Sequence, residues 1–260
     1  MTLHVAVLLT NNDDSVFAQA FPDDGQKVVS LLQPLRPHWR FSMVRVIDGE
    51  LPAAADAFDG YVITGSPASV NDDTLPWVPP LMDFIRQLHA RQRRTIGLCF
   101  GHQAIARALG GQVQRHAQGW CLGLHTTQWL WELPWMTPPR SRTTLLAAHN
   151  EQVTRLPDGA DPLSDSPFCT HGSFTVGRHI FTTQYHPEMS PRFMHALLQH
   201  LEQHLKPPSA GEGAAKARLD LRTLQATRQS LAGIDPQQAE PLEDARVFAQ
   251  WMVKFLEART

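Results

Sequence analysis

The segment that most constrains the fold of this chain is residues 97–101, GLCFG, which place Cys99 between a strand signal and a helix signal. The apolar residues 95–98 lead into the cysteine, and a helical pattern follows from 102 to 109. A sharp strand-to-helix turn crowds the backbone, and glycine two residues on either side of the central residue avoids the clash. We therefore predict an α/β fold in which the Cys99 side chain projects from the edge of a sheet.

Other apolar runs predict further strands of the same sheet. Three of them end in a polar or glycine-containing loop, as buried parallel strands do: residues 3–9, 41–47 and 60–63. Residues 78–91 have helical spacing, and a Gly-Arg pair at 177–178 predicts a hairpin between two short strands. The predicted fold class is α/β, with a mixed, mainly parallel central sheet flanked by helices.

The composition changes near residue 206, where a segment rich in Pro, Gly and Ala begins. We predict a main domain over 1–205, in which 120–176 form strands and loops, a linker over 206–213 and a helical C-terminal extension over 214–260. An apolar stripe in the extension predicts packing against the main domain or against a second copy of the chain in a homo-oligomer. The stripe consists of Ala245, Phe248, Met252, Phe255 and Leu256.

Composition excludes several classes of protein. Hydrophobic residues make up 42% of the 260 and charged residues 18%, so the chain can bury a core. The 23 Lys and Arg against 25 Asp and Glu leave a net charge of −2, which disfavours nucleic acid as a partner. No run approaches the ~18 apolar residues that would cross a membrane, and the first residues lack signal-peptide features, so we expect a cytoplasmic protein.

The cysteine and histidine patterns predict neither a metal site nor a cofactor. Cys99, Cys121 and Cys169 lie far apart with no C-x-x-C pair, which disfavours a disulfide framework and a thiolate zinc site. His200 and His204 are four residues apart on a predicted helix, but no third ligand accompanies them.

A second motif, residues 185–188 with the sequence YHPE, supplies candidate partners for the cysteine. His186 can take a proton from a thiol and return it to a leaving amine, and a carboxylate two positions later can orient the imidazole. In an extended segment, residues two apart point to the same side, so Glu188 suits this role. Each motif alone has a simpler interpretation, Cys99 as a small buried apolar residue and His186 as part of a surface turn. Their joint presence favours catalysis.

These motifs resemble those of the class I (triad) glutamine amidotransferases. The resemblance covers about residues 1–205 and rests on GLCFGHQ at 97–103, QYHPE at 184–188 and ITGSP at 63–67. It implies a flavodoxin-like fold in which Cys99 is the nucleophile, His186 the base and acid, and Glu188 the orienting carboxylate. It also implies an oxyanion hole formed by the N–H of Phe100 and one N–H of the Gly65–Ser66 turn.

Within this family the chain is similar to a stand-alone branch, close to the amidotransferase domain of GMP synthase and including γ-glutamyl peptidases. Residues 64–70 and 75–77 carry this likeness. The resemblance implies that glutamine or a γ-glutamyl small molecule binds near four residues: Gln103, Gly119, Trp120 and His149.

The chain contains no P-loop and no Ser-Gly-Gly-x-Asp-Ser type loop, so an ATP-dependent synthase reaction would need a separate protein. Two enzymatic hypotheses follow: hydrolysis or transfer at a γ-glutamyl amide bond through a thioester on Cys99, or a glutaminase subunit delivering ammonia to a separate synthase. A different thiol hydrolase and a non-catalytic binding or regulatory protein on the same fold are further alternatives. The complete Cys-His-Glu set favours an enzyme.

Overall fold

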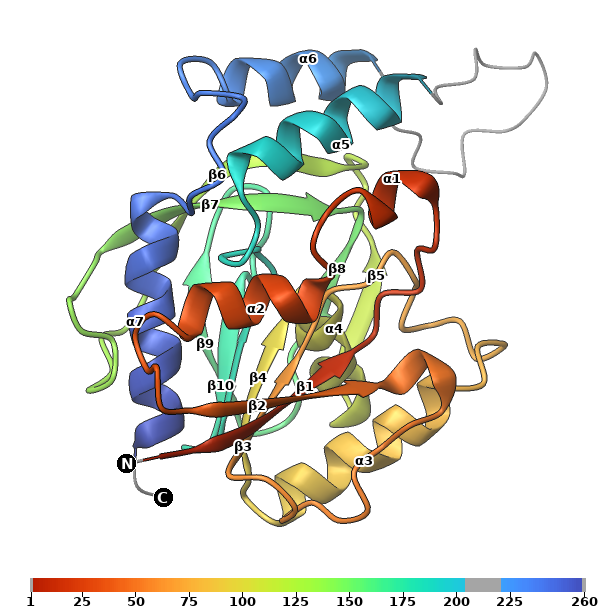
Figure 1. Ribbon diagram of the computed structural model, residues 1–260, viewed down its shortest axis with the longest axis vertical. Helices are drawn as coiled ribbons and strands as arrows, with labels where there is room; N and C mark the ends of the chain where they lie inside the picture. The colour runs from red at the N-terminus through yellow and green to blue at the C-terminus, as the bar shows by residue number, and fades with distance from the viewer. Residues whose placement is uncertain (1, 204–220, 259–260) are drawn as a thin grey trace.

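The computed structural model describes residues 2–203 and 221–258, and its centre is a nine-stranded sheet of order β2-β1-β3-β4-β11-β10-β9-β6-β7 (Figure 1). The first five strands of this order are parallel: β2 (Arg40–Arg45), β1 (His4–Leu9), β3 (Gly60–Ile63), β4 (Arg94–Leu98) and β11 (Ile180–Thr183). The rest are antiparallel: β10 (Ser173–Val176), β9 (Ala160–Asp165), β6 (Cys121–Trp129) and β7 (Arg142–His149). The predicted mixed, mainly parallel sheet is confirmed.

Helices cover both faces of the parallel strands, because their side chains alternate between two apolar cores. Val5 and Val7 of β1 face the core beneath α2 (Asp24–Leu32) and α7 (Glu243–Glu257). Ala6 and Leu8 face the core beneath α3 (Val78–Ala90) and α4 (Phe100–Ala108). The remaining helices are α1 (Val16–Gln19), the 3₁₀ turn Val46–Asp48, α5 (Pro191–Gln203) and α6 (Leu221–Ser230).

Two predicted element boundaries lie two residues away from the observed ones. The strand predicted over 41–47 ends at Arg45, because the chain turns at Val46–Asp48 and closes at Gly49, whose φ of 84° suits glycine. The helix after the cysteine begins at Phe100 rather than at 102, since the turn at Cys99 itself starts the helix. The predicted hairpin is confirmed, with β10 and β11 joined through Gly177 at a φ of 55°.

The C-terminal helix α7 is part of the main core. All five residues of the predicted stripe are at most 4% exposed. Phe248 stacks on Phe181 of β11 at 5.3 Å between ring centroids, and Trp251 contacts Trp129 of β6 edge-on at 5.0 Å. The predicted linker, 206–213, lies outside the described residues.

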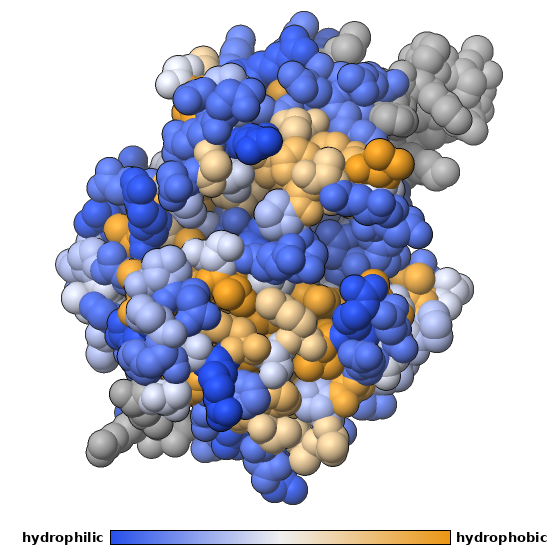
Figure 2. Space-filling view, in the orientation of Figure 1, coloured by the Kyte–Doolittle hydropathy of each residue, from blue (hydrophilic) through white to orange (hydrophobic). Residues whose placement is uncertain are grey.

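The surface in view in Figure 2 is largely polar, with apolar side chains gathered near its centre. Among the described residues, the large apolar side chains that remain exposed are Val16, Met43, Leu130 and Trp131. No helix in the described part of the chain has the length and apolar character needed to cross a membrane.

Candidate active site

The three sequence motifs meet at one edge of the sheet. The parallel strands β3, β4 and β11 are neighbours, so their carboxyl ends lie side by side. Gly65 follows β3, Cys99 follows β4 and His186 follows β11. The carboxyl edge of a parallel sheet is the usual place for a ligand site in open α/β folds.

Cys99 occupies a sharp turn with φ 48° and ψ −99°, an uncommon conformation for a residue with a side chain. The flanking glycines make this turn possible. A Cβ at position 97 would lie 2.6 Å from the carbonyl oxygen of Gly101, and a Cβ at 101 would collide with the carbonyl of Ile63. The turn delivers Cys99 to the first turn of α4, where N–H groups have no partner within the helix. Phe100 supplies one of these groups.

His186 and Glu188 form a buried pair, with 2.7 Å between His186 Nδ1 and Glu188 Oε1. The His186 backbone N–H is fixed by the carbonyl of Leu146 at 2.8 Å. Burial by itself lowers the pKa of His186, but its interactions with Cys99 and Glu188 outweigh burial and hold that pKa well above its ordinary value. The imidazole can therefore hold a proton beside the cysteine.

Gln184 contributes a contact that the sequence did not predict. Its side-chain Nε2 donates to the sulfur of Cys99 at 3.5 Å, and its Oε1 accepts from Gln103 Nε2 at 3.0 Å. Gln103 also donates to the backbone carbonyl of Glu151 at 2.7 Å. The predicted substrate-binding residue Gln103 thus links the cysteine to the strand β8 (Glu151–Arg155).

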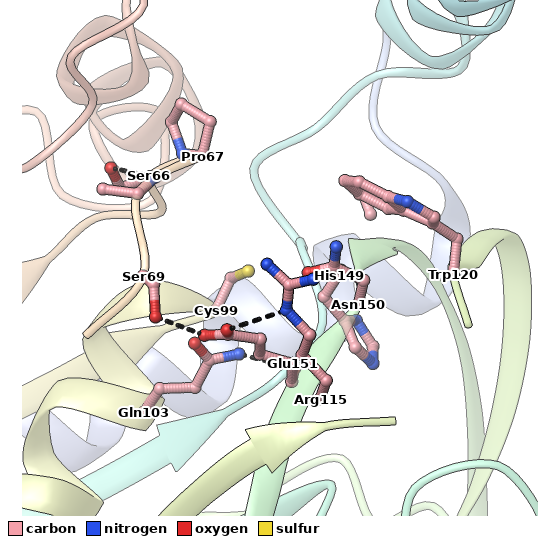
Figure 3. Close-up of a pocket in the computed structure, with 12 residues that line it drawn as sticks. Ser66, Pro67, Ser69, Cys99, Gln103, Arg115, Trp120, His149, Asn150 and Glu151 are labelled. Atoms are coloured by element: carbon pink, nitrogen blue, oxygen red, sulfur yellow. Dashed lines mark hydrogen bonds and ion pairs between the residues drawn. The ribbon is translucent and has the colours of Figure 1, made fainter. Parts of the chain in front are cut away.

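A cavity of about 130 Å³ opens beside Cys99 (Figure 3). Of the predicted binding residues, Gln103, Trp120 and His149 line it, together with Ser66 of the predicted oxyanion turn. Gly119 is not among the lining residues; its φ of 87° forms the turn that precedes Trp120.

Arg115 and Glu151 also line the cavity, although sequence reasoning gave them no role. They face each other because β5 (Gln112–Arg115) pairs with β8 in a two-stranded sheet. Arg115 Nε lies 3.8 Å from Glu151 Oε1, and Ser69 Oγ donates to Glu151 Oε2 at 2.8 Å (Figure 3). Glu151 lies two residues beyond the predicted binding residue His149, but nothing in the sequence indicates Arg115.

His149 is 4% exposed, and neither of its ring nitrogens has a hydrogen-bond partner within the described residues. Burial lowers its pKa well below the ordinary value, and the neighbouring His186 lowers it further. The His149 ring is therefore neutral, with both nitrogens unused beside the cavity.

No group of three or more metal-ligating side chains occurs in the part of the chain that the structure describes. His200 stacks on Phe17 at 4.5 Å between ring centroids, and His204 lies outside the described residues.

Residues 39–201 match the family of class I glutamine amidotransferases, and the chain belongs to this family of enzymes. It is 32% identical over 190 residues to γ-glutamyl peptidase 4 of Arabidopsis thaliana, covering 70% of this chain and 74% of the relative. It is 30% identical over 140 residues to a subunit of the glutamine-hydrolysing GMP synthase of Methanosarcina mazei, covering 52% of this chain and 67% of that relative. The crystal structure of a glutamine amidotransferase from Thermotoga maritima has the same fold, with a TM-score of 0.71 at 16% identity over 99% of this chain and all of that one.

Proposed function

We propose that the protein hydrolyses γ-glutamyl amide bonds, or transfers the γ-glutamyl group to an acceptor, through a thioester on Cys99. The observation that carries this proposal is the proximity of Cys99, which lines the cavity, to the buried His186–Glu188 pair at the same edge of the sheet. The similarity to a γ-glutamyl peptidase supports the choice of bond.

In the first half of the reaction the Cys99 sulfur attacks the γ-carbonyl carbon, a C–S bond forms, and the carbonyl electron pair moves to the oxygen. The N–H of Phe100 and an N–H of the Gly65–Ser66 turn stabilise this oxyanion. When the intermediate collapses, the C–N bond breaks and the leaving amine takes a proton from His186. The product is an amine, or ammonia when the substrate is glutamine, and a γ-glutamyl thioester remains.

In the second half a water molecule attacks the thioester and gives its proton to His186. The C–S bond breaks, glutamate leaves, and the thiolate–imidazolium pair is restored. An amine in place of water would yield a transfer product. Glu188 holds Nδ1 of His186 in both halves, which leaves Nε2 to carry the mobile proton.

The charges in the cavity suit the amino-acid end of a γ-glutamyl group. This end carries an α-ammonium and an α-carboxylate, and the cavity presents the carboxylate of Glu151 and the guanidinium of Arg115. The side chain of Glu151 is only 13% exposed, so its interaction with an ammonium is weakly screened. We assign substrate binding to these two residues together with Gln103, Trp120 and His149.

A second candidate function is that of a glutaminase subunit that delivers ammonia to a separate synthase. The similarity to the GMP synthase subunit favours it. The two functions differ in whether the isolated chain is fully active.

The purified full-length protein, incubated with glutamine and a panel of γ-glutamyl peptides, tests the proposal. We expect release of glutamate and amine from at least one compound at about 1 s⁻¹ or faster, and no release by Cys99→Ala. If the isolated protein gives only trace turnover and a co-purifying synthase raises the rate, the protein is the glutaminase subunit instead. If no compound releases glutamate with or without such a partner, and no γ-glutamyl adduct on Cys99 is found by intact-mass spectrometry, the proposal is wrong.

A further inference from the structure

Two buried threonine hydroxyls surround the backbone of the Gly65–Ser66 turn. Thr10, at the end of β1, is fully buried, and Thr64, at the end of β3, is 1% exposed. The hydroxyl oxygen of Thr10 lies 3.0 Å from the carbonyl oxygens of both Thr64 and Gly65, and its single proton is shared between these two acceptors. Thr64 Oγ1 accepts from the Thr10 backbone N–H at 3.1 Å, and its own proton can go to the carbonyl oxygen of Leu8 or of Gly65, each at 3.3 Å.

The Gly65 carbonyl depends on these hydroxyls more than its neighbours do. The carbonyl of Leu8 accepts the backbone N–H of Thr64, and the carbonyl of Thr64 accepts the N–H of Gly101. Among the described residues, the Gly65 carbonyl has no backbone donor, and the hydroxyls of Thr10 and Thr64 are its partners. A buried carbonyl needs a partner, so this pair fixes the direction in which the Gly65 carbonyl points.

The direction of this carbonyl also sets the direction of the next amide. In a trans peptide the C=O and N–H bonds point in opposite directions, and the Gly65–Ser66 bond is trans. With its carbonyl on Thr10, the peptide turns the Ser66 N–H away from the interior, and Ser66 lines the cavity next to Cys99. Pro67 has no N–H, so Ser66 provides the last amide donor of this turn.

Because residue 65 is glycine, the Gly65–Ser66 peptide needs these hydrogen bonds to keep one orientation. A Cβ there would lie 3.1 Å from Cε1 of His186 and 3.7 Å from Cβ of Cys99, so a side chain at position 65 would crowd His186. Glycine also allows the following peptide to rotate freely. A rotated peptide would direct a carbonyl oxygen, instead of an N–H, at a developing negative charge.

We propose that Thr10 is a positioning residue that holds the Gly65–Ser66 peptide with the Ser66 N–H facing the oxyanion, so that the oxyanion hole is complete in the isolated chain. This inference rests on the proposed function and selects Ser66 as the second amide donor beside Phe100. It also accounts for the proposed activity without a partner protein, because the residue that orients the peptide, Thr10, follows β1 of the same chain.

The test is Thr10→Val, which keeps the side-chain shape and removes the hydroxyl, with Thr10→Ser as the variant that retains the hydroxyl. Thr126→Val is the matched control, because the exposed Thr126 Oγ1 forms a hydroxyl–hydroxyl contact with Thr144 at 2.8 Å and does not line the cavity. Each variant is assayed for kcat and KM with a γ-glutamyl substrate. Alkylation of Cys99 by iodoacetamide is measured in parallel, because displacement at a tetrahedral carbon forms no oxyanion.

We expect Thr10→Val to lower kcat about 10²-fold, since loss of one oxyanion donor costs at least that much. KM and the rate of alkylation should stay within about threefold of wild type, and Thr10→Ser and Thr126→Val should retain near wild-type kcat. A wild-type kcat in Thr10→Val would overturn the inference. So would a parallel loss of alkylation, which would indicate general damage around Cys99.

If Thr10→Val does not fold, as judged by thermal unfolding, Thr10→Ala takes its place with the same expectations and the same refuting results. Failure of the proposed function can be told apart from failure of this inference. In the first case the wild-type protein itself releases no glutamate from any compound, and both the function and the inference are wrong. If the wild-type protein turns over but the threonine variants do so equally well, only the inference fails.

Discussion

Replacement of Glu188 by Gln tests whether the carboxylate charge supports His186 in the role of base and acid that we propose for it. The substitution keeps the size of the side chain and removes its negative charge. Glu188 is buried, and its Oε1 lies 2.7 Å from His186 Nδ1. Because burial lowers the pKa of His186 and the Glu188 charge raises it, loss of this charge should lower that pKa.

The size of the effect follows from the separation of the two charges. With 2.7 Å between the bonded atoms, the charge centres of the imidazolium and carboxylate are about 4 Å apart. Opposite charges at that distance attract by about 4 kcal/mol at an effective dielectric constant of about 20. Each 1.4 kcal/mol corresponds to about a tenfold change in rate, so Glu188→Gln should lower kcat about 10³-fold.

The assay is steady-state release of glutamate, together with alkylation of Cys99 by iodoacetamide at neutral pH. Both rates should fall, because the thiolate loses its protonated partner. Glu243→Gln is the matched control: the side chain of Glu243 is 82% exposed at the start of α7, and kcat should not change. A Glu188→Gln variant that is folded and retains more than a tenth of the wild-type kcat would refute this reasoning.

Three further predictions concern other parts of the molecule. Iodoacetamide should modify Cys99 alone, because burial raises the pKa of Cys121 far above its ordinary value and that of Cys169 to about 12. If peptide mapping finds Cys121 or Cys169 modified first, the proposal of Cys99 as the nucleophile is contradicted. Phe248→Ala should lower the free energy of unfolding in urea by about 3–5 kcal/mol, because the ring is fully buried against Phe181, and a loss below about 1 kcal/mol would contradict this packing. Burial lowers the pKa of His102 to about 3, below the 6.5 of an unfolded histidine. The stability of the protein should therefore be unaffected by His102 above pH 6.5, and it should decline as the pH falls from 6.5 towards 3, by up to about 1.4 kcal/mol per pH unit. NMR should find the His102 ring neutral at pH 5, and a protonated ring in the folded protein would disprove the shift.

Local patterns in the sequence predicted the central part of the fold and the motifs that carry the candidate site residues. The two glycines around Cys99 specify a turn that few other residues allow, and the steric reason is local. The apolar runs predicted a mainly parallel sheet, and the roles of Cys99 and His186 as nucleophile and base were predicted from their motifs and from the resemblance to a known family. The hairpin at Gly177 was equally local, since a turn depends on adjacent residues.

The sequence alone could not reveal contacts between residues that are distant along the chain. Arg115 meets Glu151 only because β5 and β8 pair, and Gln184 meets Cys99 only because β11 lies beside β4. The motif around Gln184 was visible in the sequence, but the direction of its amide was not.

The same limit applies to the helix α7, whose packing partner the sequence did not determine. The apolar stripe of α7 predicted burial against some surface, but a stripe does not identify its partner. The structure places α7 on the sheet, where Phe248 contacts Phe181. The hydrogen bond from Thr10 to the Gly65 carbonyl joins residues 55 apart, and no local pattern indicates it. Periodicity and backbone sterics are properties of short segments, whereas the choice of packing partner and the direction of a buried polar group are decided only when strands pair and helices dock.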